Sequence, residues 1–260
     1  KMPTVLSNLC TMQTVRFHDL GKMRYQLAWD NQTALHRHLV ENKLKNKHLT
    51  PKSYPQEHHL LFVEHPPVYT LGKSGSMENL LLSEVELAER GIEFFAINRG
   101  GDITFHGPGQ IVGYPILDLE CFFTDVHRYV RNIEEVIIRT IAEYGVEGFR
   151  IKDYTGVWTL ANVQCPMSNV QYPMSNVQRP MSKICAIGVH LSRWTTLHGW
   201  AFNVNTPLEY FDNIVPCGIA DKDKTVTSLA QLLGHEVDME AVKLKLKRHF
   251  GEVFECEVVG

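Results

Sequence analysis

The sequence predicts an α+β fold, in which helices pack against a sheet built largely from antiparallel strand pairs. Two apolar runs, residues 60–63 and 68–72, are separated by a Pro-Pro turn. Two more, residues 184–191 and 195–204, are separated by a short polar turn. Helical patterns fall between these strands at irregular intervals, whereas a doubly wound sheet would alternate strand and helix throughout. The spacing therefore favours α+β.

The chain opens with a predicted strand that ends near Asp19, followed by a predicted helix over residues 25–45. Ala28, Leu35 and Leu39 recur along one side of this second segment, which is the spacing of an amphipathic helix. This helix is expected to cover one face of the sheet.

A shorter helix follows the Pro-Pro strand pair. Ser83 and Glu86 have the spacing of a capping box, and Gly91 suits the position after the last turn. Residues 92–97 then predict a strand that leads into a glycine-rich segment, and residues 111–119 predict the strand after it.

One long helix is predicted in the middle of the chain. Thr124 is expected to cap it, Gly145 to end it, and Ile133, Ile137 and Ile141 to face inward. This helix is expected to be the central one.

The last part of the chain predicts three shorter helical segments. These are a helical turn at residues 206–213, a small helix at 227–233 and a final helix from the cap Asp238 to Phe250, which Gly251 is expected to end.

The composition is that of an ordinary globular protein: 260 residues, 44% hydrophobic and 21% charged, with a net charge of −3 and a pI near 6.5. This charge balance does not suggest nucleic-acid binding. Apolar runs fall short of the roughly 20 residues that a membrane-spanning helix needs. We therefore expect neither a nucleic acid nor a membrane as a partner.

The six cysteines are scattered, without a Cys-x-x-Cys pair or zinc-like spacing, and we identify no signal peptide. A reducing, cytoplasmic setting fits this pattern best. The pairs His36/His38 and His58/His59 lack the i, i+4 spacing and neighbouring glutamate of a zinc hydrolase, so a metal site is not expected.

Residues 162–182 contain three near-identical heptads, each with a proline. Proline excludes a coiled coil, and three copies of seven residues are too short for a solenoid. We interpret the segment as a surface insertion, at about 162–182, in a single domain that spans residues 1–260.

Residues 99–110 read Arg-Gly-Gly-Asp-Ile-Thr-Phe-His-Gly-Pro-Gly-Gln and are expected to form a shaped loop around a ligand. The alternative is a β-hairpin turn followed by a Pro-Gly turn, with a histidine that only satisfies backbone groups. A phosphate-binding loop is disfavoured, because the segment leads into a strand-like run and not into a Gly-Lys-Ser/Thr helix start.

Cys217 is the cysteine most suited to chemistry, because Pro216 and Gly218 hold it on a short turn. A nearby lysine would lower the pKa of the thiol and could accept its proton. A purely structural thiol is the alternative. Cys121 and Cys185 alternate with apolar neighbours and are expected in the core.

Six motifs in order resemble the lipoyl(octanoyl) transferase (LipB) family of lipoate biosynthesis, over nearly the whole chain. They are the segment 99–110, Thr155-Gly-Val-Trp158, Lys183-Ile-Cys-Ala-Ile-Gly188, His198-Gly199, Asn203-Val-Asn205 and Ile214-Val-Pro-Cys-Gly-Ile219. The glycine-rich segment and the Pro-Cys-Gly turn are highly specific when they occur together.

The resemblance implies a mixed, largely antiparallel sheet packed with helices, similar to the catalytic domains of biotin ligase and lipoate-protein ligase. It implies transfer of an octanoyl group from acyl carrier protein to a lysine of lipoyl domains, without a metal or nucleotide cofactor. The acceptors would be the lipoyl domains of 2-oxoacid dehydrogenase E2 subunits and the glycine cleavage H protein.

The resemblance also implies roles for individual residues. Cys217 would carry the acyl thioester and Lys183 would lower the pKa of its thiol. The substrate-contacting positions would be Arg99, Gly100, Gly101, Asp102, Ile103, Thr104, Phe105, His106, Ala186, Ile187, Gly188, Gly199, Trp200 and Ala201.

Two other functions fit parts of the pattern. A ligase that adenylates free octanoate or lipoate would require ATP, whereas the transferase would not. A protein that only binds lipoyl domains would form no acyl-enzyme.

Overall fold

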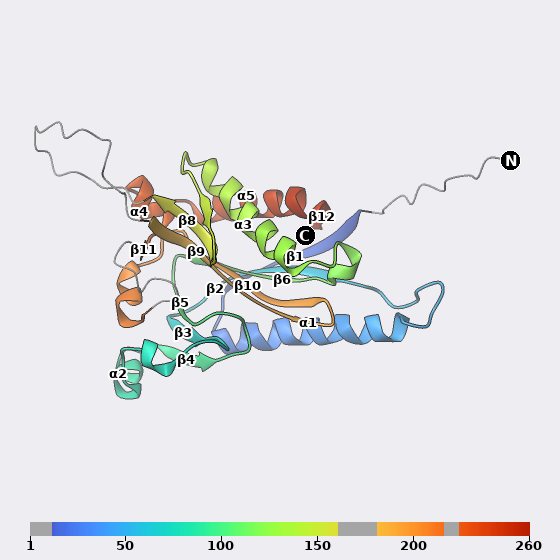
Figure 1. Ribbon diagram of the computed structural model, residues 1–260, viewed down its shortest axis with the longest axis horizontal. Coiled ribbons are helices and arrows are strands. Elements are labelled where there is room, and N and C mark those ends of the chain that lie inside the picture. Colours follow the sequence, from blue (N-terminus) through green and yellow to red (C-terminus); the bar gives the residue numbers. More distant parts are fainter. Residues whose placement is uncertain (1–11, 161–180, 216–223) are drawn as a thin grey trace, which may run out of the picture.

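The computed structural model describes residues 12–160, 181–215 and 224–260 (Figure 1). Within these residues, a nine-stranded sheet forms the body of the protein, and its order is β12-β1-β2-β6-β10-β9-β8-β7 with β11 beside β9. Its strands are β1 (Gln13–Lys22), β2 (His58–Glu64), β6 (Gln110–Ile116), β7 (Phe149–Ile151), β8 (Tyr154–Leu160), β9 (Met181–Ser192), β10 (Thr195–Asn203), β11 (Lys224–Val226) and β12 (Cys256–Val259).

The main sheet is mixed and largely antiparallel, which confirms the predicted fold class. β1 is parallel to both β2 and β12, and β11 is parallel to β9. The pairs between β2, β6, β10, β9, β8 and β7 are antiparallel. The predicted strand pair near residue 190 is the β9–β10 hairpin, in which Ser192 pairs with Thr195 and Cys185 with Phe202.

A second sheet of three strands lies beside the first and has the order β4-β3-β5. Its strands are β3 (Val68–Leu71), β4 (Glu93–Ala96) and β5 (Ile103–His106). The Pro-Pro turn therefore separates two strands that enter different sheets. Val68 is buried against Tyr25 and Ile97, away from the main sheet.

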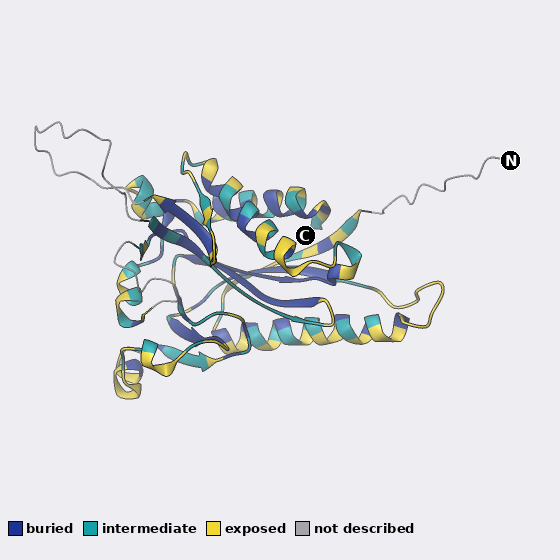
Figure 2. Ribbon diagram, in the orientation of Figure 1, coloured by how far each residue is buried: buried dark blue, intermediate teal, exposed yellow. Residues whose placement is uncertain are grey.

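Helices cover both faces of the main sheet (Figure 1). α3 (Val126–Ala142) and α5 (Met239–Phe254) pack on one face, and α1 (Tyr25–Asn46) packs on the other. The shorter helices are α2 (Glu84–Glu89), α4 (Leu229–Leu233) and the 3₁₀ turns η1 (Met77–Asn79), η2 (Leu119–Cys121) and η3 (Leu208–Asn213). Figure 2 shows the central strands buried between these layers.

Helix α1 confirms the predicted amphipathic helix over residues 25–45. Ala28 and Leu39 are buried in the core beneath the sheet, and Leu35 packs at its edge. The capping box at Ser83 is also confirmed, since Ser83 Oγ accepts from the Glu86 N–H and Glu86 Oε2 accepts from the Ser83 N–H.

The long helix α3 begins one residue later than predicted. Asp125, not Thr124, is its N-cap, and Asp125 Oδ1 accepts a hydrogen bond of 3.0 Å from the N–H of Arg128. An ionised carboxylate at this position also interacts favourably with the helix dipole, which a threonine hydroxyl does not do.

Gly251 does not end the last helix, contrary to the prediction. α5 continues to Phe254, and the rings of Phe250 and Phe254 stack with centroids 4.4 Å apart. A Cβ at Gly251 would lie 3.0 Å from the Cys256 carbonyl oxygen, so the glycine lets β12 fold back closely against the helix.

The glycine-rich segment 99–110 is not a continuous loop. Residues 103–106 form β5, in which Ile103 pairs with Leu71 and Phe105 with Tyr69. The alternating pair Ile103 and Phe105 is buried, and burial of this pair explains the strand. The segment is not a β-hairpin either, because β5 pairs with β3, whereas β4 lies on the other side of β3 and β6 belongs to the main sheet.

The predicted surface insertion lies outside the described residues except for its last two positions. Met181 and Ser182 belong to β9 and not to a loop, because they pair with Leu160 and Thr159 of β8 and with Lys224 and Thr225 of β11. Among the described residues, no helix is long and apolar enough to span a membrane.

We predict that Asp125→Ala lowers the free energy of unfolding by about 1 kcal/mol, because an N–H of the first turn of α3 loses its acceptor. Urea denaturation would measure this change. The matched control is Thr124→Ala, which should cost much less. Equal losses for the two variants would contradict the assignment of the cap.

Candidate functional site

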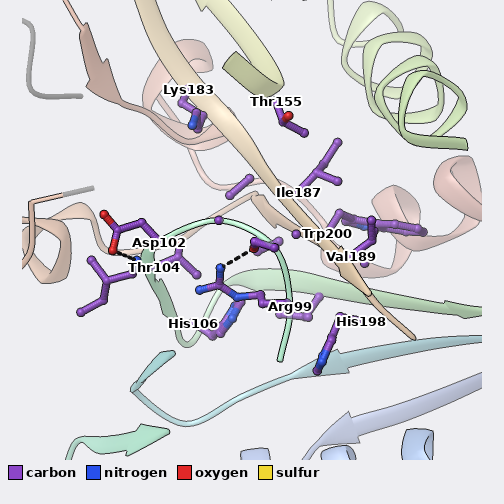
Figure 3. Close-up of a pocket in the computed structure, with 18 of the residues that line it drawn as sticks. Arg99, Asp102, Thr104, His106, Thr155, Lys183, Ile187, Val189, His198 and Trp200 are labelled. Atoms are coloured by element: carbon purple, nitrogen blue, oxygen red, sulfur yellow. Dashed lines mark hydrogen bonds between the residues drawn. The ribbon is translucent and has the colours of Figure 1, made fainter. Parts of the chain in front are cut away.

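A cavity of about 320 Å³ lies where the β9–β10 hairpin, β5, β6 and the start of α1 meet (Figure 3). Its volume is near the lower end of the roughly 300–1,000 Å³ found for small-molecule sites. The cavity therefore suits a small ligand or a short chain.

One part of the cavity wall is apolar and another part is polar. Ile187, Val189 and Trp200 lie together on one side, and Arg99 and His106 lie across the cavity from them (Figure 3). Lys183 and Thr155 line the end where β8 and β9 run side by side. The cavity thus combines an apolar surface with a terminal amine.

Arg99 is buried between the two sheets. Its Nη2 donates to the carbonyl oxygen of Thr70 at 2.6 Å and to Thr70 Oγ1 at 3.0 Å, and its Nη1 donates to the carbonyl oxygen of Gly100 at 3.0 Å. These bonds hold a cation beside the cavity in one orientation.

His106 is buried and neutral. Burial, with smaller contributions from His65 and Arg99, holds the pKa of His106 well below its ordinary value. Its Nδ1 lies 2.9 Å from Gln110 Oε1, and its Nε2 lies 3.2 Å from Thr70 Oγ1. The amide oxygen can only accept, so Nδ1 carries the proton and Nε2 accepts from Thr70.

Two glycines let the walls approach closely enough to shape the cavity. A Cβ at Gly188 would lie 2.9 Å from Arg99 Cδ, and a Cβ at Gly113 would lie 2.2 Å from Trp200 Cε2. Glycine at these positions allows Arg99 to lie over β9 and Trp200 to lie over β6.

Lys183 projects from β9 over an aromatic ring. Its Nζ lies 4.7 Å from the centroid of the fully buried Trp158, which is opposite Lys183 in the pairing of β8 with β9. A cation over an indole face is attracted by the ring quadrupole. Trp158 therefore restricts where the amine can lie.

The β8 strand beside Lys183 is held by a buried carboxylate of α3. Glu134 Oε1 accepts from the Gly156 N–H at 3.1 Å, and Glu134 Oε2 pairs with Arg131 at 2.6 Å and with Arg150 at 3.1 Å. Gly156 has φ +125°, and the β8–β9 register shifts just after it. The carboxylate stabilises this irregular strand.

Two further histidines near the cavity are neutral because they are buried. Burial lowers the pKa of His65 to about 4 and that of His198 to about 3. His65 Nδ1 donates to the Met23 carbonyl oxygen at 2.8 Å, and its Nε2 lies 2.9 Å from the hydroxyl of Tyr114. His198 Nε2 lies 2.7 Å from Asn98 Oδ1.

Nearly all of the substrate-contacting positions that the sequence implied are brought together here. Those that line the cavity are Arg99, Gly100, Gly101, Asp102, Ile103, Thr104, His106, Ala186, Ile187, Gly188, Gly199, Trp200 and Ala201, together with Lys183. Phe105 does not line it, because its ring stacks on Tyr210 with centroids 4.5 Å apart. Cys217 lies outside the described residues.

Several lining residues had no signal in the sequence. Tyr25, Tyr114 and Val130 come from three elements far apart in the chain. Asn203, which also lines the cavity, belongs to the Asn203-Val-Asn205 motif, but nothing in its spacing indicated where it would lie. Their convergence depends on strand pairing, which the sequence does not reveal.

Of the two cysteines expected in the core, Cys185 is confirmed there, whereas Cys121 in η2 is only half-buried. Cys185 is fully buried, and burial raises the pKa of its thiol well above the ordinary value. Burial also raises the pKa of the half-buried Cys121 to about 11. Among the residues that the structure describes, no group of three or more metal-ligating side chains comes together.

The chain matches the model of the lipoyl protein ligase A/B catalytic domain over residues 17–251. It is 50% identical to the octanoyltransferase of Flavobacterium psychrophilum over 95% of this chain and 99% of the relative. It is 41% identical to that of Caldicellulosiruptor saccharolyticus over 95% of this chain and 88% of the relative.

Solved structures share the fold at low sequence identity. A putative lipoate protein ligase from T. acidophilum matches with a TM-score of 0.60 at 15% identity, covering 95% of this chain and 88% of that one. A lipoate-protein ligase A bound with ATP matches with a TM-score of 0.60 at 13% identity, covering 96% and 90%.

We predict that stability falls as the pH is lowered from about 6.5 towards 4, and that His65→Gln makes this fall less steep. The unfolded chain protonates His65 near its ordinary pKa, whereas in the folded protein that pKa is about 4. The unfolded state therefore binds more protons in this window, and His65 alone accounts for a loss on the order of 3 kcal/mol.

Urea denaturation at a series of pH values would measure the slope. The control is His127→Gln, on the exposed side of α3, which should leave the slope unchanged. A His65→Gln slope equal to that of the wild type would contradict the prediction.

Proposed function

The chain belongs to the octanoyltransferases of the lipoyl protein ligase A/B catalytic-domain family, and we propose that it transfers an octanoyl group from acyl carrier protein to a lysine of lipoyl domains. The transfer runs through a thioester on Cys217, with Lys183 as the partner of that thiol. This reaction belongs to lipoate biosynthesis.

The observation that carries the proposal is the single cavity described above. Residues from widely separated parts of the sequence line it, with apolar side chains along one side and the amine of Lys183 at one end. An octanoyl chain is apolar along its length and reactive at its carbonyl. The wall matches this distribution, because Ile187, Val189 and Trp200 can pack against the chain.

The described residues on either side of Cys217 in the chain support its assignment to this cavity. Phe211 precedes it and Val226 follows it, and both line the cavity. Val226 lies directly opposite Lys183 in the parallel pairing of β11 with β9. The segment between them contains the sequence Pro216-Cys217-Gly218.

The proposed chemistry needs Cys217 as a thiolate and a base that can take its proton. The ammonium of Lys183 lowers the thiol pKa by electrostatic attraction. Lys183 takes the thiol proton, the thiolate attacks the donor carbonyl, the bond between the carbonyl carbon and the carrier sulfur breaks, and the Lys183 ammonium returns the proton to the leaving carrier sulfur. The two thioesters are nearly equal in energy, so this first step is reversible.

The second step forms an amide. The neutral amine of the acceptor lysine attacks the Cys217 thioester, the C–S bond breaks, and the proton from the amine returns to the sulfur through Lys183. An amide is more stable than a thioester, so this step drives the transfer. Water competes for the same carbonyl, and the buried walls of the cavity exclude it.

The partners follow from this chemistry. The donor is octanoyl-acyl carrier protein, and the acceptors are the lipoyl domains of 2-oxoacid dehydrogenase E2 subunits and the glycine cleavage H protein. In both steps the acyl group that is transferred is already activated as a thioester, so the reaction does not require ATP. This distinguishes it from ligation of free octanoate or lipoate.

We predict that incubation with octanoyl-acyl carrier protein, without ATP, adds one octanoyl mass to the protein at Cys217. Mass spectrometry of the intact protein and its peptides would detect this product. Cys217→Ser should form no thioester, whereas Cys185→Ser, at a buried thiol, should still form one. Product formed only from free octanoate with ATP would overturn the transferase, and binding of a lipoyl domain without acylation would favour a non-catalytic protein.

We predict that Lys183→Ala slows alkylation of Cys217 by iodoacetamide about tenfold at pH 7, because the thiolate loses its neighbouring cation. The matched control is Lys224→Ala, which removes a cation from the adjacent strand, 4.4 Å from the centroid of the Tyr154 ring. Equal alkylation rates for wild type and Lys183→Ala would contradict the proposed pair.

A further inference from the structure

A chain of buried side-chain hydrogen bonds connects the Arg99 side of the cavity to the backbone of Lys183. Its first links, from Arg99 through Thr70 and His106 to Gln110, are described above. The remaining links cross from β6 to β10 and then reach the corner after β11. They pass through Asn203.

The orientation of the Asn203 side-chain amide is fixed by the donors and acceptors around it. Gln110 Nε2 donates to Asn203 Oδ1 at 2.9 Å, and Asn203 Nδ2 donates to the Thr227 carbonyl oxygen at 3.0 Å. Gln110 and Asn203 are both nearly completely buried. Neither amide can rotate by 180° without placing two donors or two acceptors against each other.

The backbone of Thr227 connects Asn203 to Lys183, because its carbonyl oxygen accepts from Asn203 and its N–H donates to Lys183. The Thr227 N–H donates to the Lys183 carbonyl oxygen at 3.0 Å, directly after the pairing of Val226 with Lys183. The start of α4, just after this corner, is tied to the residue that follows β10, because the Ala230 N–H donates to the Val204 carbonyl oxygen at 2.8 Å. Asn203 therefore holds the backbone of Thr227, and Thr227 in turn holds the backbone of Lys183.

Asn205, two positions along, provides an internal comparison. It also makes two side-chain hydrogen bonds to backbone, accepting from the Val237 N–H at 2.9 Å and donating to the Val237 carbonyl oxygen at 2.8 Å. These bonds hold the segment before α5 and do not reach Lys183. The two asparagines of one Asn-Val-Asn motif thus serve different parts of the molecule.

We propose that Asn203, supported by Gln110, is a positioning residue that sets where the Lys183 amine lies over Trp158 and beside the cavity. The catalytic part of this inference rests on the proposed function, in which Lys183 assists Cys217. The geometric part does not, because it concerns only how Lys183 is held. An error of about 1 Å in the position of such a group can cost a hundredfold in rate.

Replacing Asn203 leaves the charged and titratable side chains around Lys183 chemically unchanged. In the described part of the chain these include Asp153 and Tyr154 on the cavity wall, Cys185 in β9, Lys224 in β11 and Glu134 in α3. A change in the behaviour of Lys183 in an Asn203 variant would therefore come from its position, since these groups are unaltered.

The test compares Asn203→Ala with Asn205→Ala in the full chain. Competitive labelling with acetic anhydride, read by mass spectrometry, reports the reactivity of each lysine across pH. We expect Asn203→Ala to change the Lys183 labelling rate at least threefold relative to the other lysines and to slow Cys217 acylation about tenfold. Asn205→Ala should change neither.

Equal effects of the two variants on Lys183, or no effect of Asn203→Ala, would overturn the inference. If Asn203→Ala does not fold, Gln110→Met takes its place, because it removes the donor to Asn203 Oδ1 while keeping a side chain of similar length; it should shift Lys183 labelling in the same direction. A wild-type protein that forms no Cys217 thioester would refute the proposed function, while the Lys183 labelling would still test the positioning by itself.

Discussion

The contact between the Arg99 segment and Gly188 is the constraint on which the site depends. The Gly100 N–H donates to the Val189 carbonyl oxygen at 3.0 Å, and Arg99 lies across β9 where a Cβ at Gly188 would be 2.9 Å from its side chain. This contact joins the small sheet to the β9–β10 hairpin. Without it, the residues of β5 and those of β9 would not line one cavity.

The same contact places a buried cation beside the hydrogen-bonded, uncharged side chains of Thr70 and His106. Arg99 orders Thr70, which in turn orders His106, and the bonds continue through Gln110 and Asn203 towards Lys183. A low-dielectric site strengthens each of these bonds and makes a missing partner costly. The cavity is therefore rigid where it holds Lys183 and apolar where an acyl chain would lie.

Local patterns predicted the elements whose signals are contained within one segment. The side of α1 marked by Ala28 and Leu39, the Ser83 capping box and the β9–β10 hairpin are of this kind. The strands β8, β11 and β12 were missed, because each is stabilised by pairing with a strand from another part of the chain. The three-residue β7 was also missed, although it pairs with the neighbouring β8. For the site, motif resemblance indicated most of the lining residues, but Tyr25 and the role of Asn203 emerged only from the packed structure.

The central claim is that the cavity holds the acyl chain of a Cys217 thioester next to Lys183. A crystal structure of the protein after reaction with octanoyl-acyl carrier protein tests it most directly. Our account predicts continuous density from the Cys217 sulfur along Ile187 and Gly188, with the Lys183 amine within direct or water-mediated hydrogen-bonding distance of the sulfur. An acylated Cys217 whose chain lies outside this cavity, with Lys183 remote from the sulfur, would contradict the account.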